Sequence, residues 1–149
     1  MDYESIVFDY VEDEKTLTQI ASIYMSVFNG EPWKDKWTFE GAFDRLKHFY
    51  DSPNHLGLYA SIGKGIVGCL VGNIEPFYSG DYFHLKEMFV VQQRQGIGSS
   101  LINKLGGVLK EKGVKSIFVF TGNNGYPIEF YKKNGFESTN MSLLSRTIE

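Results

Sequence analysis

The segment that decides the fold is Val90-Val91-Gln92-Gln93-Arg94-Gln95-Gly96-Ile97-Gly98-Ser99. It joins an apolar, β-branched stretch to a stretch with helical spacing, so we expect it to link a strand to a helix. Gly96 and Gly98 let the backbone approach a ligand closely. The first turn of a helix offers free N–H groups and a positive dipole end, which attract an anion, and Arg94 adds a charge suited to a pyrophosphate.

Three other interpretations of this glycine segment have to be weighed. A dinucleotide-binding Gly-x-Gly-x-x-Gly would need a third glycine, where Leu101 stands. A phosphate-binding loop of the Walker type would need Ser or Thr after Gly63-Lys64, but Gly65 follows. The third interpretation is a turn eased by glycine that binds nothing, and the segment alone does not exclude it.

The pattern along the rest of the chain predicts a single domain over residues 1–149 with the order βααβββαβαβ. We expect strands at 5–11, 56–62, 66–75, 82–91, 116–120 and 136–148, and helices at 13–29, 38–50, 96–111 and 127–133. The unit from 82 to 120 predicts a parallel crossover, whereas 56–75 predicts an antiparallel hairpin. The fold class is therefore α/β (α+β), a mixed and mostly antiparallel central sheet with helices on both faces.

Composition and charge restrict the function and the surroundings of the protein. The net charge is -3 and no Lys/Arg-rich run exists, which argues against a nucleic-acid partner. No apolar run approaches the roughly 20 residues of a membrane span. The start, Met1-Asp2-Tyr3-Glu4, lacks the features of a signal peptide, and Cys69 is the only cysteine. We therefore expect a cytoplasmic protein without membrane contact.

The glycine segment and two other stretches resemble one known family. Gln93-x-x-Gly96-x-Gly98 is similar to the Gln/Arg-x-x-Gly-x-Gly/Ala motif of the GCN5-related N-acetyltransferases (GNAT). Residues 85–90 resemble the fourth strand of that family. Asn124, Tyr131 and then Gly135-Phe136 resemble its later Asn…Tyr-x-x-x-Gly-Phe signature. The resemblance implies the acyl-CoA N-acyltransferase-like fold, although the connection from Val90 to Gln93 is shorter than the family's usual one.

The resemblance also implies acetyl-CoA as the co-substrate and a set of residues that contact it. The pyrophosphate is expected on the amides of Gln95 to Ser99, and the pantetheine arm beside the strand that precedes them. Asn124 is expected either to shape the cofactor contact or to cap the last helix. The implied cofactor-binding residues are Met88, Phe89, Val90, Gln93, Arg94, Gln95, Gly96, Ile97, Gly98, Ser99, Asn124 and Tyr131.

Tyr131 is the candidate general acid. It matches the family tyrosine that approaches the cofactor sulfur, and a tyrosine with its reference pKa of about 10 stays protonated at neutral pH. The alternative is an ordinary helix tyrosine packed with Phe130 and Phe136.

Glu87 is the candidate general base, acting directly or through a water. In a regular strand it shares a face with Phe83, Leu85 and Phe89, and such surroundings should raise the pKa of its carboxyl. The alternative is an ion pair, for instance with Lys86 or with a lysine elsewhere in the chain. His84 falls on the opposite face of a regular strand and is interpreted as a surface or core histidine.

No metal is expected. Asp81, His84 and Glu87 have the spacing of metal ligands only on a helix, and on a strand they alternate between faces. Cys69 lies in an apolar strand without a basic neighbour, so we expect a buried, inert thiol.

The acceptor is expected at the loop between the first two helices, as the resemblance implies. The candidate substrate-binding residues are Glu31, Trp33, Trp37 and, from a second loop, Phe77. Aromatic walls and a carboxylate suit a cationic amine. Alternatively, Trp33 and Trp37 pin the loop to the core.

Together these observations predict transfer of an acetyl group from acetyl-CoA to a primary amine of a small molecule, by direct attack in a ternary complex. A protein N-terminal or lysine acetyltransferase is one alternative, and a non-catalytic acyl-CoA sensor is another. A homodimer is an open alternative for the assembly.

Overall fold

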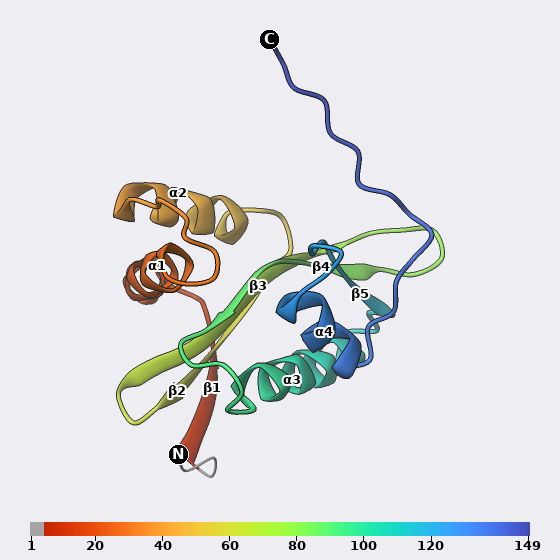
Figure 1. The fold of residues 1–149 in the computed structure, drawn as a ribbon. Helices are drawn as coiled ribbons and strands as arrows, with labels where there is room; N and C mark the ends of the chain where they lie inside the picture. Colours follow the sequence, from red (N-terminus) through yellow and green to blue (C-terminus); the bar gives the residue numbers. More distant parts are fainter. Residues whose placement is uncertain (1–4) are drawn as a thin grey trace. The chain divides into compact units, whose positions relative to one another are not determined.

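The computed structural model describes residues 5–149, so the acidic start at 1–4 lies outside the described residues. The chain forms nine helices and strands in the order βααβββαβα over these residues (Figure 1). It divides into two compact units, the first ending at Phe118 and the second spanning Val119–Glu149. The elements are β1 (Ile6–Tyr10), α1 (Glu14–Asn29), α2 (Phe39–Tyr50), β2 (His55–Ile62), β3 (Gly65–Glu75), β4 (Tyr82–Val90), α3 (Ile97–Glu111), β5 (Ser116–Val119) and α4 (Tyr126–Lys133).

The sheet has the strand order β1-β2-β3-β4-β5. β1 to β4 form consecutive antiparallel pairs, which confirms the predicted hairpin of β2 and β3. β5 lies beside β4, and the N–H of Lys115 donates to the carbonyl of Asp81, 3.0 Å away. The starts of β4 and β5 therefore lie side by side, as a crossover through α3 requires.

Helices cover both faces of this sheet, with α1 and α2 on one and α3 on the other (Figure 1). The amphipathic patterns of α1 and α2 bury Leu17, Ile20 and Leu46 completely. On the α3 face, the side chains of Leu101 and Ile97 come so close to Gly68 that a Cβ there would lie 3.0 and 3.1 Å from them. The core of the α1–α2 face consists of Val11, Leu17, Ile20, Ala21, Tyr24, Ala42, Leu46, Cys69, Val71 and Phe89.

The helices begin where capping residues predict. Asp13 Oδ1 accepts from the N–H of Thr16 at 2.7 Å, and Thr38 Oγ1 accepts from that of Gly41 at 3.0 Å. Gly113, in the left-handed region at φ 75°, follows the end of α3. No helix among residues 5–149 has the length and apolar character needed to span a bilayer.

A β-bulge in β4 changes which side chains share a face. Val71 of β3 pairs with Glu87, but Gly72 pairs with Leu85, so Lys86 is the extra residue. Paired residues point to the same face, and Val71 belongs to the α1–α2 core. Glu87 therefore faces α1 and α2, while Leu85 faces α3.

Two predictions about faces are consequently wrong. The prediction assumed a regular strand, and the bulge breaks that assumption: Glu87 shares its face with Phe89, which pairs with Cys69 of the same core, but not with Phe83 or Leu85. His84 pairs with Asn73, two residues from Val71, and so lies on the same face as Glu87 rather than the opposite one. Because Lys86 is an extra residue in β4, each residue before it points to the face opposite to the one that a regular strand would give.

The final strand predicted at 136–148 does not form, so the last β of the expected order is wrong. Residues 136–149 carry no helix or strand. A segment of this kind forms a strand only if another strand supplies the partner hydrogen bonds. The large apolar side chains of the segment are exposed: Met141 (80%), Leu143 (73%), Leu144 (87%) and Ile148 (86%).

Candidate active site

The connection from β4 to α3 has the geometry of an open helix start. Gly96 occupies the N-cap position in the left-handed region, φ 79°, where a side chain would be strained. Arg94 also has a positive φ of 63°, an unfavourable value for a residue with a Cβ. The glycine at 96 is thus required by the turn itself, whether or not a ligand binds.

The first turn of α3 leaves backbone donors available. The first α-helical bond joins the N–H of Ser100 to the carbonyl of Gly96, at 3.0 Å. The N–H groups of Ile97, Gly98 and Ser99 precede it and have no carbonyl within the helix. Gly96 has no side chain to cap them, and no side-chain cap bond is made there. Such a turn can bind an anion through backbone alone.

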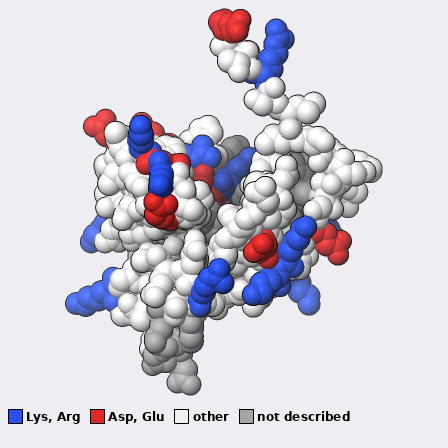
Figure 2. All heavy atoms as spheres, in the orientation of Figure 1, with Lys and Arg blue, Asp and Glu red and all other residues white. Residues whose placement is uncertain are grey.

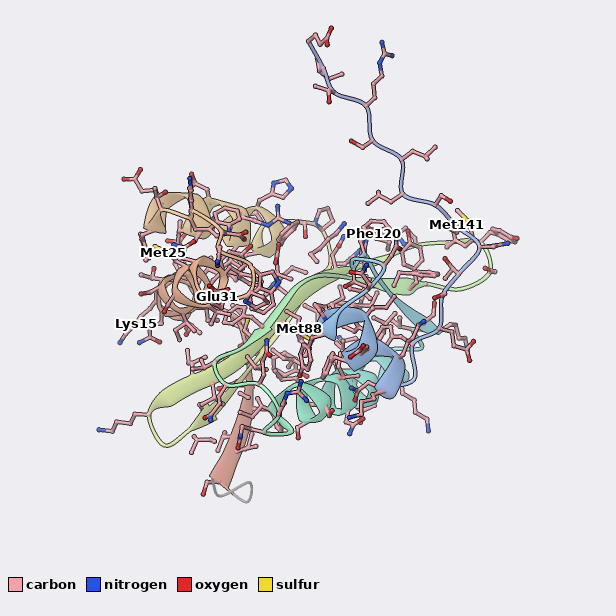
Figure 3. All side chains as sticks on the ribbon, in the orientation of Figure 1. Lys15, Met25, Glu31, Met88, Phe120 and Met141 are labelled. Carbon is pink, nitrogen blue, oxygen red and sulfur yellow. The ribbon has the colours of Figure 1, made fainter. Side chains whose placement is uncertain are left out.

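β4 lies between β3 and β5 in the sheet, and it is longer than β5. β4 has nine residues and β5 has four, and their starts lie side by side. The second half of β4, which contains Met88, Phe89 and Val90, therefore runs beyond the end of β5. Met88 pairs with Leu70, and Figure 3 labels it on β4 above α3.

Glu87 lies in the interior of the α1–α2 face with two polar partners. Its side chain is only 12% exposed, and its Oε1 accepts from Nε of Arg45 on α2. Tyr24, a residue of α1 that is 3% exposed, is a polar neighbour close enough to affect the ionisation of both Glu87 and Arg45. Glu87 thus forms an ion pair, as the alternative interpretation held, but its partner is Arg45 and not Lys86 or another lysine.

Burial governs the ionisation of this cluster. It raises the pKa of the Glu87 carboxyl above its ordinary value, as predicted, while Arg45 and Tyr24 oppose the rise by favouring the carboxylate. Burial and the charge of Glu87 raise the pKa of the Tyr24 hydroxyl, so this group stays protonated and donates. The same two causes raise the pKa of the buried Cys69 thiol, in line with the inert thiol that sequence predicts.

A second polar group lies on the same face, toward the start of β4. Tyr82 donates its hydroxyl proton to Glu75, and Nδ1 of His84 lies 3.8 Å from Oε1 of that carboxylate. Nζ of Lys86 is 2.9 Å from the same Nδ1. Burial and the nearby Lys86 lower the pKa of His84.

The loop between α1 and α2 is fixed to the first helix mainly by Trp37. Asn29 bonds the backbone of Trp37 twice, donating at 2.9 Å and accepting at 2.7 Å. The Trp37 ring lies edge-on to Tyr24 at 5.3 Å, and its Nε1 donates to Asp35 at 3.0 Å. Trp37 therefore pins the loop, as the alternative interpretation held.

Trp33 and Glu31 are placed differently. The Trp33 ring packs edge-on against Phe28 at 5.0 Å. Glu31, labelled in Figure 3 on the loop after α1, has an exposed side chain and pairs with Lys34 at 3.1 Å. Acidic and basic side chains are interspersed around α1 and α2 in Figure 2.

Phe77 lies in the loop between β3 and β4 within a group of aromatic rings. It is 55% exposed, and its ring centroid is 4.9 Å from that of Tyr78 and 6.2 Å from that of Tyr82. Tyr82 in turn lies edge-on to Phe118 at 5.0 Å. An exposed aromatic surface therefore adjoins the carboxylate of Glu75.

The second unit contains Tyr131 and Asn124. The Tyr131 ring contacts Phe130 at 5.3 Å and Phe136 at 5.2 Å, as sequence spacing predicts. The N-cap of α4 is Gly125, without a side-chain cap bond, so Asn124 does not cap this helix. The cofactor contact of Asn124 stays a prediction.

Sequence reasoning missed Arg45, Tyr24 and the position of His84. Arg45 and Tyr24 belong to helical patterns in which they look like an ordinary surface charge and an ordinary core aromatic. The bulge that repositions His84 leaves no mark in the residue pattern of β4. Among residues 5–149 there is no group of three or more His, Cys, Asp or Glu side chains placed to hold a metal ion.

Comparisons with known proteins agree with this geometry. A family model described as "Acetyltransferase (GNAT) family" matches residues 17–136. The chain is also similar to an uncharacterized N-acetyltransferase of Chlorobaculum tepidum. The two are 25% identical over 127 residues, which cover 84% of this chain and 70% of that protein.

Two solved structures share the fold at low identity. An aminoglycoside acetyltransferase from an uncultured soil metagenomic sample, in complex with sisomicin, has a TM-score of 0.77 and 19% identity over 98% of each chain. An acetyltransferase of the GNAT family from Staphylococcus aureus has a TM-score of 0.71 and 17% identity, over 96% of this chain and 99% of that one.

Proposed function

Because the chain belongs to the GNAT acetyltransferase family, we propose that it transfers an acetyl group from acetyl-CoA to a primary amine of a small molecule, within one ternary complex. The observation that carries the proposal is the open first turn of α3, with Gly96 at its N-cap. Backbone donors there suit a pyrophosphate, and the glycine-only cap leaves them accessible. The phosphate contacts are assigned to Gln93, Arg94 and the backbone of Gln95–Ser99.

The residues divide between binding and chemistry in this proposal. Acetyl-CoA, when bound, supplies the acetyl group and a thiolate leaving group. Met88, Phe89 and Val90 line the arm that carries the thioester. Glu87 accepts the proton that the attacking amine loses, and Tyr131 donates its hydroxyl proton to the departing sulfur. Asn124 contributes to the cofactor contact.

A small amine is preferred as the acceptor for two reasons. Aminoglycoside acetylation is the activity named for the soil enzyme of the same fold. In this chain, the half-buried Trp33 and the exposed Phe77 offer aromatic surface, and Glu31 offers a carboxylate, to a cation. Trp37 supports the loop that carries Trp33. We expect a monomeric or homodimeric protein that acts in the cytoplasm.

Cofactor binding is tested by calorimetry with acetyl-CoA. Gly98→Trp puts an indole against the donors of the first turn, so the affinity should fall roughly tenfold or more. Gly107→Trp is the matched control, because it lies on the same helix with open space around it and should bind like wild type. Equal affinity of Gly98→Trp and wild type would remove the phosphate assignment.

Turnover is tested by thiol release over a panel of small amines and peptides. Tyr131→Phe should lower kcat about a hundredfold, the usual contribution of a general acid, with little change in acetyl-CoA affinity. Tyr10→Phe, a partly exposed tyrosine on β1, is the control and should keep wild-type kcat. Turnover on peptides alone would instead support a protein acetyltransferase, and binding without any turnover would support a sensor.

A further inference from the structure

Three elements converge on the carboxylate of Glu87. Arg45 reaches it from α2 through a direct ion pair, and Tyr24 of α1 is a neighbouring hydroxyl that also favours the carboxylate. Glu87 itself stands next to the extra residue of the bulge in β4, which turns it toward these helices. The Glu87 side chain is 12% exposed and that of Arg45 is 44% exposed, so the pair bridges the interior and the surface of the α1–α2 face.

Arg45 also contacts an aromatic ring of its own helix. Its guanidinium carbon lies 5.1 Å from the centroid of the Phe49 ring, one turn further along α2. The guanidinium therefore contacts an aromatic ring as well as the carboxylate. Such a fixed cation favours one orientation of the carboxylate as well as its charge.

The other groups that face Glu87 cannot replace this cation. Tyr24 is a neutral donor, and the Cys69 thiol of β3 is neutral too. Asp35, on the loop after α1, carries a negative charge that opposes ionisation of Glu87. His84 lies on the same face of β4, where its Nδ1 is 2.9 Å from Nζ of Lys86 and 3.8 Å from Oε1 of Glu75. Arg45 is thus the cation in direct contact with Glu87.

We propose that Arg45 sets the protonation and orientation of Glu87 and is thereby a positioning residue for acetyl transfer, an inference that rests on the proposed function. A buried carboxylate without a cation tends to hold a proton and cannot take one from the amine. With Arg45 present, the carboxylate is ionised at a lower pH, and the proton that the amine loses has an acceptor.

Burial and Arg45 act in opposite directions on the pKa of Glu87, and this determines the direction in which the pH profile should move. Burial raises the pKa of the Glu87 carboxyl, and Arg45 is the first of the groups that lower it. Replacing Arg45 by a neutral residue removes the charge that counteracts the effect of burial. The pKa of the Glu87 carboxyl must therefore rise further. A base with a higher pKa is protonated over a wider range of acidic pH. The acidic limb of kcat/KM against pH should therefore move to higher pH.

The experiment compares Arg45→Gln, Arg45→Lys and wild type in kcat/KM from acid to alkaline pH with one amine. On the acidic limb Arg45→Gln should lose roughly tenfold in kcat/KM, with a smaller change on the plateau, while Arg45→Lys keeps most of the wild-type profile. Lys47→Gln removes a cation from the same helix that pairs with Asp51 and Glu14, and should leave the limb in place.

A second measurement does not depend on turnover. The carbon-13 resonance of the Glu87 carboxyl, assigned by its loss in Glu87→Gln, is followed through a pH titration of each variant. A midpoint that rises in Arg45→Gln and not in Lys47→Gln supports the inference. A midpoint that stays at the wild-type pH overturns it, whatever the activity. A midpoint that rises while the limb of kcat/KM stays in place upholds the coupling and removes Glu87 as the base of the proposed function.

Discussion

Gly72 is the residue at which β3 passes closest to the bulge of β4. A Cβ at this position would lie 2.2 Å from the carbonyl oxygen of His84 and 2.5 Å from Cζ of Phe83. Both neighbours belong to the strand that carries Glu87, and one of them is backbone. The register of β3 against β4 therefore depends on the absence of a side chain at Gly72.

We predict that Gly72→Ala lowers the free energy of unfolding by about 1–3 kcal/mol, because the added methyl forces β4 to shift. The measurement is urea denaturation followed by circular dichroism. Gly65→Ala, on the same strand, is the control: its nearest contact would be the carbonyl oxygen of Ile62 at 3.7 Å, an ordinary distance. Equal midpoints for the two variants would contradict the close approach of the strands at Gly72.

The bulge also shows what sequence could and could not predict about single residues. The raised pKa of Glu87 was predictable, because it follows from placing a carboxyl in an apolar strand. Its neighbours were not, since one inserted residue at Lys86 exchanges the faces of everything before it. The ion pair with Arg45 joins residues 42 positions apart, and no local pattern contains such a contact.

α3 contains two glycines at interior positions, where the helix propensity of glycine is unfavourable. Gly106 and Gly107 lie inside the helix, where glycine costs about 1 kcal/mol relative to alanine. An added Cβ at Gly106 would meet nothing within 4 Å. Gly113 has equally open surroundings, but its φ of 75° is one that an L side chain adopts at a cost.

The two positions should respond in opposite directions to the same substitution. Gly106→Ala is expected to raise the free energy of unfolding by roughly 0.5–1 kcal/mol, because the helix is favoured over the unfolded chain. Gly113→Ala is expected to lower it by about 1 kcal/mol, because the left-handed turn is strained. Thermal denaturation of both variants checks this, and a lower midpoint for Gly106→Ala than for wild type would contradict the helix geometry.

The elements as a group show why local patterns predict helices better than the last strand. A helix closes its hydrogen bonds within itself, and α1 and α2 begin directly after Asp13 and Thr38, whose side chains cap them. A strand needs a neighbour. Residues 136–148 have the apolar pattern of a strand, but that pattern does not indicate whether a neighbouring strand is available, and none forms there.

At the scale of the molecule, the order of elements and three motifs in register were sufficient to predict the family: the glycine segment, residues 85–90, and the signature that runs from Asn124 to Phe136. The predicted order differs from the observed one only in its last strand. The proposed base and acid, by contrast, lie in the two separate units into which the chain divides, Glu87 in the first and Tyr131 in the second. A reaction that uses both Glu87 and Tyr131 therefore requires both units, and the test of each role requires the intact protein.

Stability of the whole fold should depend on pH through His55, at the start of β2. Its Nε2 is buried and has no hydrogen-bond partner among residues 5–149, and burial lowers its pKa below the ordinary 6.5. The unfolded chain therefore takes up a proton at a higher pH than the folded protein does. The contribution to stability is complete above the unfolded pKa and is lost as the pH falls from there toward the folded pKa.

We therefore predict a free energy of unfolding that falls between about pH 7.5 and about pH 5.5, a window set by the ordinary histidine value. In His55→Leu, which cannot titrate at this position, the fall should be smaller, whereas His48→Gln, on the exposed part of α2, should keep the wild-type slope. Burial lowers the pKa of His84 as well, so it adds a fall of the same sign to every variant. The raised pKa of Glu87 acts in the opposite direction, because the folded protein takes up that proton first. The contributions of His84 and Glu87 are the same in wild type, His55→Leu and His48→Gln, so the difference in the slope of stability against pH is due to His55. Equal slopes for His55→Leu and wild type would show that the His55 ring is not buried in the neutral form.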